Sequence, residues 1–303
     1  MNFFDKRESG RVRKPLYMAL YSGPGVGKSS AAATFPKPHF FDFEESTHTL
    51  DVSRSRPLEW DEIMSDLNEI LERDELPEIE TIVFDTIDEL ERLIHHKIAD
   101  KAKKDNIGDI GWQRGYSLAV DYWAELISIT RQIRDKHKTH TVFLAHASSR
   151  TATDFEKEKD FARYKMAIHP KACDYIFGQV EMVLFAKKDI AFKTVDDKTF
   201  AKDLDNRILC TSLSAYFDAK NRIGLPATLP MPKKNMFQVL WSAYNAAFDA
   251  TPDKTYKEII DLIPGIKDEA LRKSMTDYTN INKDNSEILI AIKQKILAKK
   301  QEQ

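Results

Sequence analysis

The stretch LYMALYSGPGVGKSSAAATF, residues 16–35, decides the fold class of the chain. Residues 17–21 form a short apolar run that is typical of a buried strand. Glycines interrupt this run, and small residues from 29 to 34 indicate the start of a helix. A strand, a glycine-rich loop, Gly-Lys-Ser and a helix follow one another in this order in a P-loop. The sequence therefore predicts an α/β fold with a phosphate-binding loop.

The residue types in this loop define its expected chemistry. Glycines let consecutive backbone N–H groups turn toward phosphate oxygens, and the helix N-terminus adds partial positive charge. Lys28 is expected to reach the β- and γ-phosphates and the Ser29 hydroxyl to bind Mg²⁺, so the predicted ligands are ATP and Mg²⁺. Ser22 departs from the G-x-x-x-x-G-K-[ST] pattern, which has glycine there. The predicted nucleotide-binding residues are Gly23, Gly25, Val26, Gly27, Lys28, Ser29 and Ser30.

Two further apolar segments end in acidic residues. HFFDFEES (residues 39–46) predicts a strand followed by Glu44, and TIVFDTIDEL (residues 81–90) predicts a strand that ends at Asp85. The carboxyl ends of parallel strands form the ligand-binding edge of an open α/β sheet, so both carboxylates are expected near the phosphates. Asp85 is the predicted Walker B residue, a metal ligand together with Ser29; the alternative is a simple helix N-cap.

A third apolar segment, THTVFLAHASS (residues 139–149), predicts a strand that ends at His146. Taken alone, a histidine there is more often structural than phosphate-sensing. With these motifs in this order, the chain resembles the RecA-type recombinase core over residues 16–248, and in particular the phage single-strand annealing proteins of the Sak type. The resemblance implies a RecA-like P-loop NTPase core with Glu44 as general base and Asp85 on the Walker B strand. His146 would take the γ-phosphate-sensing place that a glutamine has in RecA.

The segment YFDAKNRIGLP (residues 216–226) adds an expectation about assembly. The resemblance implies that Lys220 and Arg222 reach the γ-phosphate of a neighbouring subunit. Two cations from a second subunit would neutralise charge during phosphoryl transfer, as an arginine finger does. Without the resemblance, the same residues are only a basic turn.

The resemblance also implies two DNA-binding loops, residues 101–117 and 147–171. The first contains glycines, lysines and aromatic residues, and base stacking on an aromatic side chain suits single-stranded DNA. From residue 150 to 171 there are six Lys and Arg against four Asp and Glu, so the second loop is only slightly basic. For the first loop, the alternative is that Trp112 and Tyr116 anchor it on the core. For the second loop, the alternative is a solvated, charged helix and loop. The candidate DNA-binding residues are Trp112, Arg114, Arg150, Arg163, Tyr164 and Lys165.

Composition and pattern suggest how the 303 residues are divided. We expect an N-terminal arm at 1–14, a core at 15–248 with a mostly parallel sheet, and a small helical appendage at 249–303. VEMVLFAKK, IAFKTV and NRILCTSLS predict separate strands of an antiparallel extension. The net charge of −2 excludes a protein that is basic all over. Two distant cysteines, no membrane-spanning run and no signal peptide favour the cytoplasm. The resemblance implies that this is the cytoplasm of a phage-infected bacterial host.

The predicted function is an ATP-dependent recombinase that binds single-stranded DNA and promotes annealing or strand exchange in phage recombination. Its ATPase is expected to be slow and DNA-stimulated, its assembly a filament or ring, and its partners to include a single-strand DNA-binding protein. One alternative is a small-molecule P-loop kinase or NTPase without a nucleic-acid role. The other is a non-catalytic annealing or adaptor protein that ATP only gates.

Overall fold

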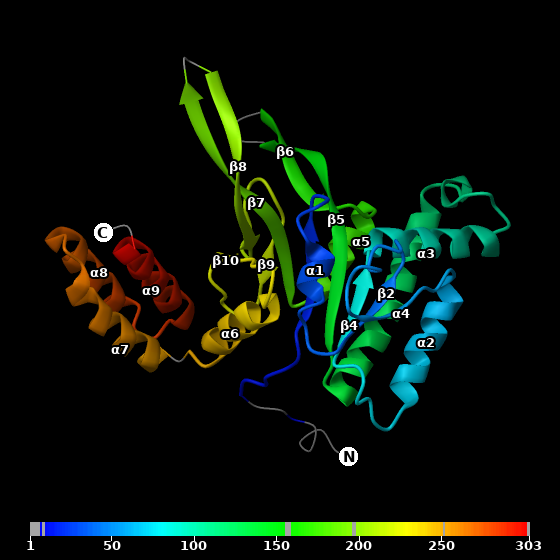
Figure 1. Cartoon of the computed structure of the whole chain (residues 1–303), viewed down its shortest axis with the longest axis horizontal. Coiled ribbons are helices and arrows are strands. Elements are labelled where there is room, and N and C mark those ends of the chain that lie inside the picture. Colours follow the sequence, from blue (N-terminus) through cyan, green and yellow to red (C-terminus); the bar gives the residue numbers. More distant parts are fainter. Residues whose placement is uncertain (1–6, 8–9, 155–158, 196–197, 251, 302–303) are drawn as a thin grey trace.

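The computed structural model describes residues 7, 10–154, 159–195, 198–250 and 252–301. It is an α/β protein built on a central sheet (Figure 1). The strands are β1 (Tyr17–Ser22), β2 (Pro38–Asp42), β3 (Ser53–Ser55), β4 (Thr81–Asp85), β5 (His140–Asp154), β6 (Lys159–Met166), β7 (Met182–Val195), β8 (Lys198–Cys210), β9 (Lys220–Asn221) and β10 (Thr228–Pro230). The helices are α1 (Lys28–Ala32), α2 (Trp60–Glu72), α3 (Ile87–Lys101), α4 (Arg114–His137), α5 (Pro170–Gln179), α6 (Met236–Phe248), α7 (Pro252–Leu262), α8 (Glu269–Ile281) and α9 (Ser286–Gln301).

The strand order explains where ligands meet the sheet. The strands lie in the order β10-β8-β7-β1-β5-β4-β2-β3, with β6 paired to β5 and β9 to β7. Pairing is parallel from β7 through β1, β5, β4 and β2 to β3, and antiparallel for β6, β8, β9 and β10. This confirms the predicted mostly parallel sheet with an antiparallel extension. The glycine loop leaves the sheet at the end of β1, between β5 and β7.

The alternation of side chains along β1 divides the core into two layers. Tyr17, Ala19 and Tyr21 pack into the cluster that α2, α3, α4 and α5 cover. Leu16, Met18 and Leu20 face the other cluster, which α1 and α6 cover. Successive side chains of a strand point to opposite faces, so a short apolar run such as this one can be buried on both sides.

Two long hairpins project beyond the carboxyl edge of the parallel strands (Figure 1). One is formed by β5 and β6, and the other by β7 and β8. The prediction of a loop after His146 is therefore wrong, because β6 continues the sheet with alternating exposure from Phe161 to Met166. The high charge of this segment hid its period of two. Likewise, VEMVLFAKK and IAFKTV belong to one strand, β7.

Residues 11 and 13 of the N-terminal segment contact the core at the end of α6. The side chain of Arg11 donates to the carbonyl oxygen of Phe248 at 2.8 Å, and Arg13 pairs with Asp249 at 2.5 Å. Helices α7, α8 and α9 lie to one side of the sheet and enclose an apolar cluster of their own (Figure 1). Within the part of the chain that the structure describes, none of the helices combines the length and the apolar character needed to cross a bilayer.

Candidate active site

The glycine loop is shaped by its own backbone and by a neighbouring strand. Gly25 and Gly27 have φ angles of 73° and 97°, a region that favours glycine. Arg207 of β8 donates a hydrogen bond of 2.8 Å from Nη1 to the carbonyl oxygen of Val26. A Cβ atom at Gly27 would collide with the same Nη1. The positive φ angle favours glycine at this position, and the close approach of the flexible Arg207 side chain is a contact that the loop motif does not predict.

The serine that departs from the motif fits into the turn. Ser22 is fully buried at the end of β1, and its hydroxyl donates to the carbonyl oxygen of Gly23 at 2.8 Å. The loop then continues into α1, whose first residue is Lys28. The departure at Ser22 therefore leaves the path of the loop into the helix intact.

Lys28 and Asp85 are the buried opposite charges of the site, 7% and 1% exposed. Burial lowers the pKa of Lys28, and the nearby carboxylates of Asp85 and Glu44 oppose this effect. Burial raises the pKa of Asp85 to about 6, although the neighbouring Ser29 hydroxyl acts to lower it. Neither Asp85 oxygen makes a hydrogen bond of normal geometry with the described residues. Unpaired carboxylate oxygens beside a serine hydroxyl are suitable ligands for Mg²⁺ or its water shell.

Glu44 reaches the same region from the turn after β2. Asp42 ends that strand and accepts hydrogen bonds of 3.0 and 3.1 Å from two N–H groups of the following turn. These bonds fix the turn that carries Glu44. The Thr86 hydroxyl, from the residue after β4, donates to Glu44 Oε1 at 2.8 Å. The two strand ends are therefore tied together at the site.

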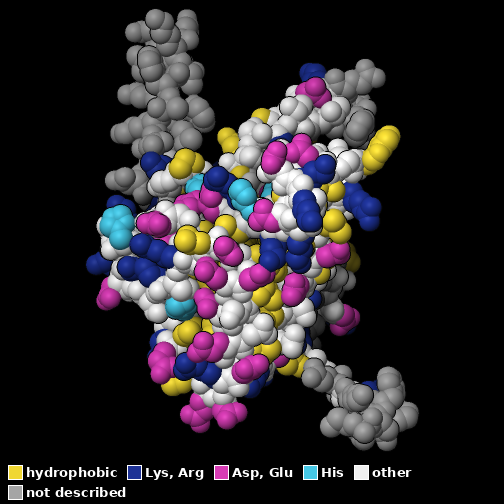
Figure 2. Space-filling view, turned by 90° about the vertical axis from the view of Figure 1, so that its right-hand side faces the viewer, with side chains coloured by type: hydrophobic (Ala, Val, Ile, Leu, Met, Phe, Trp, Pro, Cys, Tyr) yellow, Lys and Arg dark blue, Asp and Glu magenta, His cyan; other side chains and the backbone are white. Residues whose placement is uncertain are grey.

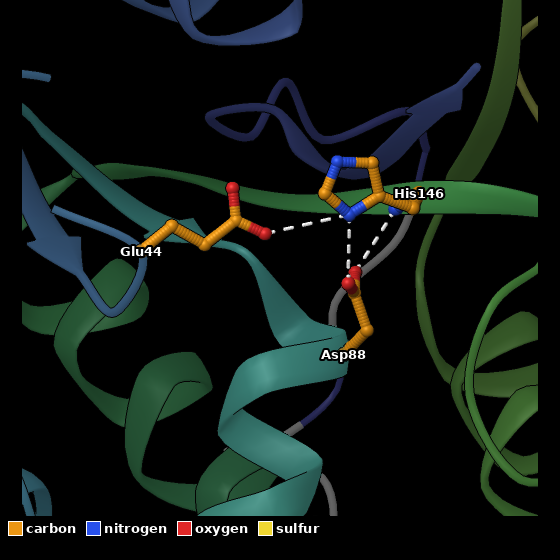
Figure 3. A group of neighbouring side chains, drawn as sticks. All are labelled: Glu44, Asp88 and His146. Atoms are coloured by element: carbon orange, nitrogen blue, oxygen red, sulfur yellow. Dashed lines mark hydrogen bonds and ion pairs between the residues drawn. The ribbon is translucent and has the colours of Figure 1, made fainter. Parts of the chain in front are cut away.

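His146 lies among carboxylates at the edge of the site (Figure 3). Its Nδ1 is 2.7 Å from Asp88 Oδ2 and 3.4 Å from Glu44 Oε1. Its backbone N–H also donates to Asp88 Oδ1 at 2.9 Å. Asp88 comes from the first turn of α3, three residues after Asp85, and the sequence motifs do not single it out. The sequence feature that could have indicated Asp88 is its position one helical turn after Asp85, which puts both side chains on the same side of the helix start.

One cavity of about 270 Å³ joins these groups. The glycine loop, the turn after β2, the end of β4 and the end of the parallel part of β5 all contribute to it. The lining residues are Pro24, Gly25, Gly27, Lys28, Ser29, Ser30, Glu44, Ser46, Thr49, Leu50, Asp85, Thr86 and His146. A cation, backbone N–H groups and a serine hydroxyl suit phosphate and Mg²⁺, so the residues present fit an ATP–Mg²⁺ ligand.

Lys220 and Arg222 lie away from this cavity. Strand β9 pairs with the start of β7 at Met182 and Val183, whereas the glycine loop begins level with Ala186 of β7. The Lys220 ammonium donates to the carbonyl oxygen of Phe177, and Arg222 Nη2 donates to that of Gly178 at 2.9 Å. Burial and the charge of Arg222 lower the pKa of Lys220 to about 8. Neither residue lines the cavity of its own chain, so a role in hydrolysis requires a second subunit.

The predicted cations of the β5–β6 hairpin have partners within the chain. Arg163 and Lys165 lie 2.6 and 3.3 Å from the carboxylate of Asp218. The Arg150 guanidinium donates to the carbonyl oxygen of Met166 at 3.4 Å and to that of Ile168. Tyr164 is 44% exposed, and the back of its ring stacks on Phe185. Of these four candidates, Tyr164 is the most exposed, and the side chains of Arg163 and Lys165 are 21% and 30% exposed.

The first predicted DNA-binding loop carries a fully exposed aromatic ring. Trp112 is entirely solvent-exposed, and Arg114, at the start of α4, is also exposed. The loop is anchored instead by Tyr116, whose ring stacks on His169 at 4.2 Å. Figure 2 shows Lys and Arg side chains intermixed with Asp and Glu over this face of the molecule. The interpretation of Trp112 as an anchor is therefore wrong, and this face of the molecule carries charges of both signs.

Comparison with known proteins agrees with this site. A family model described as an AAA domain matches residues 14–223, which is more than half of the chain and includes every segment that lines the cavity. No curated protein shows significant similarity to the sequence.

Proposed function

The chain belongs to the AAA-domain family of P-loop ATPases, and from this premise we propose that ATP hydrolysis in the cavity serves annealing or exchange of complementary single-stranded DNA. One observation carries the DNA part of the proposal. His146 lines the cavity, and β5, which carries it, continues directly into the β5–β6 hairpin. Because β5 both lines the nucleotide cavity and forms one arm of the exposed hairpin, a ligand on the hairpin and hydrolysis in the cavity would affect each other through this strand.

The residues of the cavity divide the chemical work. Lys28 neutralises charge on the phosphates, and Glu44 accepts a proton from the attacking water. Mg²⁺, held by Ser29 and Asp85, would supply further positive charge to the phosphate oxygens. Lys220 and Arg222 would complete the site from a neighbouring subunit, so assembly into a filament or ring is part of the proposal. Lys220 and Arg222 would then have to release the hydrogen bonds that they donate to the carbonyl oxygens of Phe177 and Gly178.

Single-stranded DNA would be held mainly by stacking. Trp112 and Tyr164 offer exposed aromatic faces, and stacking contributes about 1–3 kcal/mol per base. Arg163 and Lys165 share one carboxylate, so this group carries two positive charges against one negative. Backbone contacts should therefore be few, and salt should weaken binding with a shallow slope. A single-strand DNA-binding protein is a further expected partner.

DNA binding is tested by fluorescence anisotropy of a labelled oligonucleotide with a non-hydrolysable ATP analogue. Trp112→Ala and Tyr164→Ala should each weaken binding about fivefold or more, from the loss of one stacked base. Tyr278→Ala is the matched control, because Tyr278 is a 51% exposed aromatic residue on α8, outside the core that carries the site. Equal affinities for all four proteins would contradict the proposal.

The role of hydrolysis is tested separately with Glu44→Gln, which removes the proton acceptor and keeps the shape of the side chain. We expect this variant to bind ATP and DNA but to lose strand annealing in a complementary-oligonucleotide assay. Full annealing activity would instead identify the protein as an adaptor that ATP only gates. ATP turnover without any DNA binding would favour a small-molecule NTPase.

A further inference from the structure

One carboxylate holds His146 at two points. Asp88 Oδ1 accepts from the backbone N–H of His146 at 2.9 Å, and Asp88 Oδ2 lies 2.7 Å from its Nδ1. The Asp88 side chain is 16% exposed and that of His146 is 32% exposed. Figure 3 shows the second ring nitrogen, Nε2, on the side of the ring away from Asp88. The two bonds together fix both the position of the strand and the rotation of the ring.

The chemistry of a carboxylate decides which nitrogen carries the proton. An ionised carboxylate can only accept a hydrogen bond, so Nδ1 must be the donor in this pair. Glu44 Oε1, at 3.4 Å from the same nitrogen, is a second acceptor on that side. In the neutral ring, Nε2 is then left with its lone pair free. His146 lines the same cavity as Lys28, so Nε2 is the acceptor that the ring would offer to a water molecule there.

We propose that Asp88 is a positioning residue that fixes His146 with Nδ1 protonated and with Nε2 as the acceptor for a water molecule in the nucleotide cavity. The inference rests on hydrolysis in this cavity but not on any role in DNA binding. Asp88 acts through His146: it orients the ring, and no proton leaves it during the reaction. The same carboxylate joins α3 to β5 at the base of the hairpin, so it also fixes the strand from which the hairpin begins.

The same three side chains also have the composition of a metal site. One donor atom each from Glu44, Asp88 and His146 lies within 4.8 Å of the others. The short Nδ1 to Oδ2 distance favours the hydrogen bond, because a metal would replace the proton on Nδ1 and separate the two ligand atoms. Metal binding is therefore an outcome that the experiment must distinguish.

The test is a double-mutant cycle on basal ATP hydrolysis with Asp88→Asn, His146→Gln and the double variant. Asp88→Asn should lower kcat about tenfold and leave ATP affinity within about twofold. The double variant should be no slower than His146→Gln alone, because Asp88 acts on hydrolysis through the ring, while the amide oxygen that Asp88→Asn introduces can still accept from the His146 backbone N–H. Glu89→Gln is the matched control: Glu89 shares the first turn of α3 but pairs with Arg92 at 2.9 Å, so kcat should not change.

Nitrogen-15 NMR of the imidazole groups gives a second readout that does not depend on turnover. The wild type should show the Nδ1-protonated form of His146, and Asp88→Asn should lose it. Additive effects in the cycle, or a wild-type ring protonated only at Nε2, would overturn the proposal. The proposal would also be overturned if Mn²⁺ alone bound stoichiometrically to the nucleotide-free wild type and Asp88→Asn abolished this binding. If the wild type hydrolyses no ATP, the proposed function fails while the NMR result still decides the orientation of the ring.

Discussion

Asp85 is expected to destabilise the nucleotide-free protein. Its carboxylate is 1% exposed, makes no hydrogen bond of normal geometry with the described residues, and has its pKa raised from 3.8 to about 6. One pKa unit corresponds to about 1.4 kcal/mol, so ionised Asp85 costs the folded state about 3 kcal/mol relative to the unfolded chain. Asp85→Asn removes this charge at nearly constant shape and should stabilise the protein by up to that amount at pH 8.

The sign of the pH dependence follows from the two pKa values. Below the unfolded pKa of 3.8 both states hold the proton, so Asp85 contributes no penalty. As the pH rises toward about 6, the unfolded chain ionises first and the penalty grows; above about 6 it is complete. The free energy of unfolding, measured by denaturant titration from pH 4 to 8, should therefore diverge between the wild type and Asp85→Asn with increasing pH.

Asp42 supplies the matched control, since it ends the neighbouring strand and is equally buried. It accepts hydrogen bonds from Ser46 N, Thr47 N and, at 2.5 Å, Thr47 Oγ1. Asp42→Asn should thus destabilise the protein, by about 1–3 kcal/mol. If Asp85→Asn lowers stability at pH 8 as Asp42→Asn does, the Asp85 carboxylate is paired and the reasoning fails. Mg²⁺ with a nucleotide should stabilise the wild type more than Asp85→Asn.

Two further predictions concern the glycine loop and the subunit interface. Gly27→Ala should destabilise the fold by about 1–2 kcal/mol, because its φ angle of 97° strains any residue that carries a Cβ atom. Gly23→Ala, where a Cβ meets nothing within 4 Å, should change thermal stability little, and equal effects of the two variants would contradict the reasoning. Lys220→Ala and Lys28→Ala should each abolish hydrolysis, yet mixing the two inactive proteins should restore part of it. A mixture that stays inactive while still assembling would show that Lys220 does not act across an interface.

The local sequence motifs predict the residues that line the cavity, but they do not predict the contacts that reach it from distant parts of the sequence. Lys28, Asp85 and His146 each follow an apolar run, so strand prediction alone brings them to one edge of the sheet. Asp88 and Arg207 reach the same site across 58 and 181 residues of sequence. Neither residue belongs to a periodic sequence pattern. Their contacts depend on how α3 and β8 pack against the sheet, which the motifs do not specify.

The β5–β6 hairpin shows why charge misled the sequence interpretation. Arg163 and Lys165 alternate with Tyr164, a strand pattern in which the inward positions hold cations in place of apolar residues. These cations are satisfied by Asp218, which lies 55 residues from Arg163 and follows β8. A single sequence does not reveal that ion pairing, so the sequence alone suggests a solvated, charged loop where the structure has a hairpin.

Communication between the nucleotide cavity and a bound strand is tested most directly by steady-state ATP turnover with and without a single-stranded oligonucleotide, at low and at high salt. Turnover should increase when the oligonucleotide is added, and the increase should diminish only slightly at high salt, because few backbone contacts give binding a shallow salt slope. Turnover that is identical with and without DNA at both salt concentrations, from protein that binds the oligonucleotide, would contradict coupling through β5.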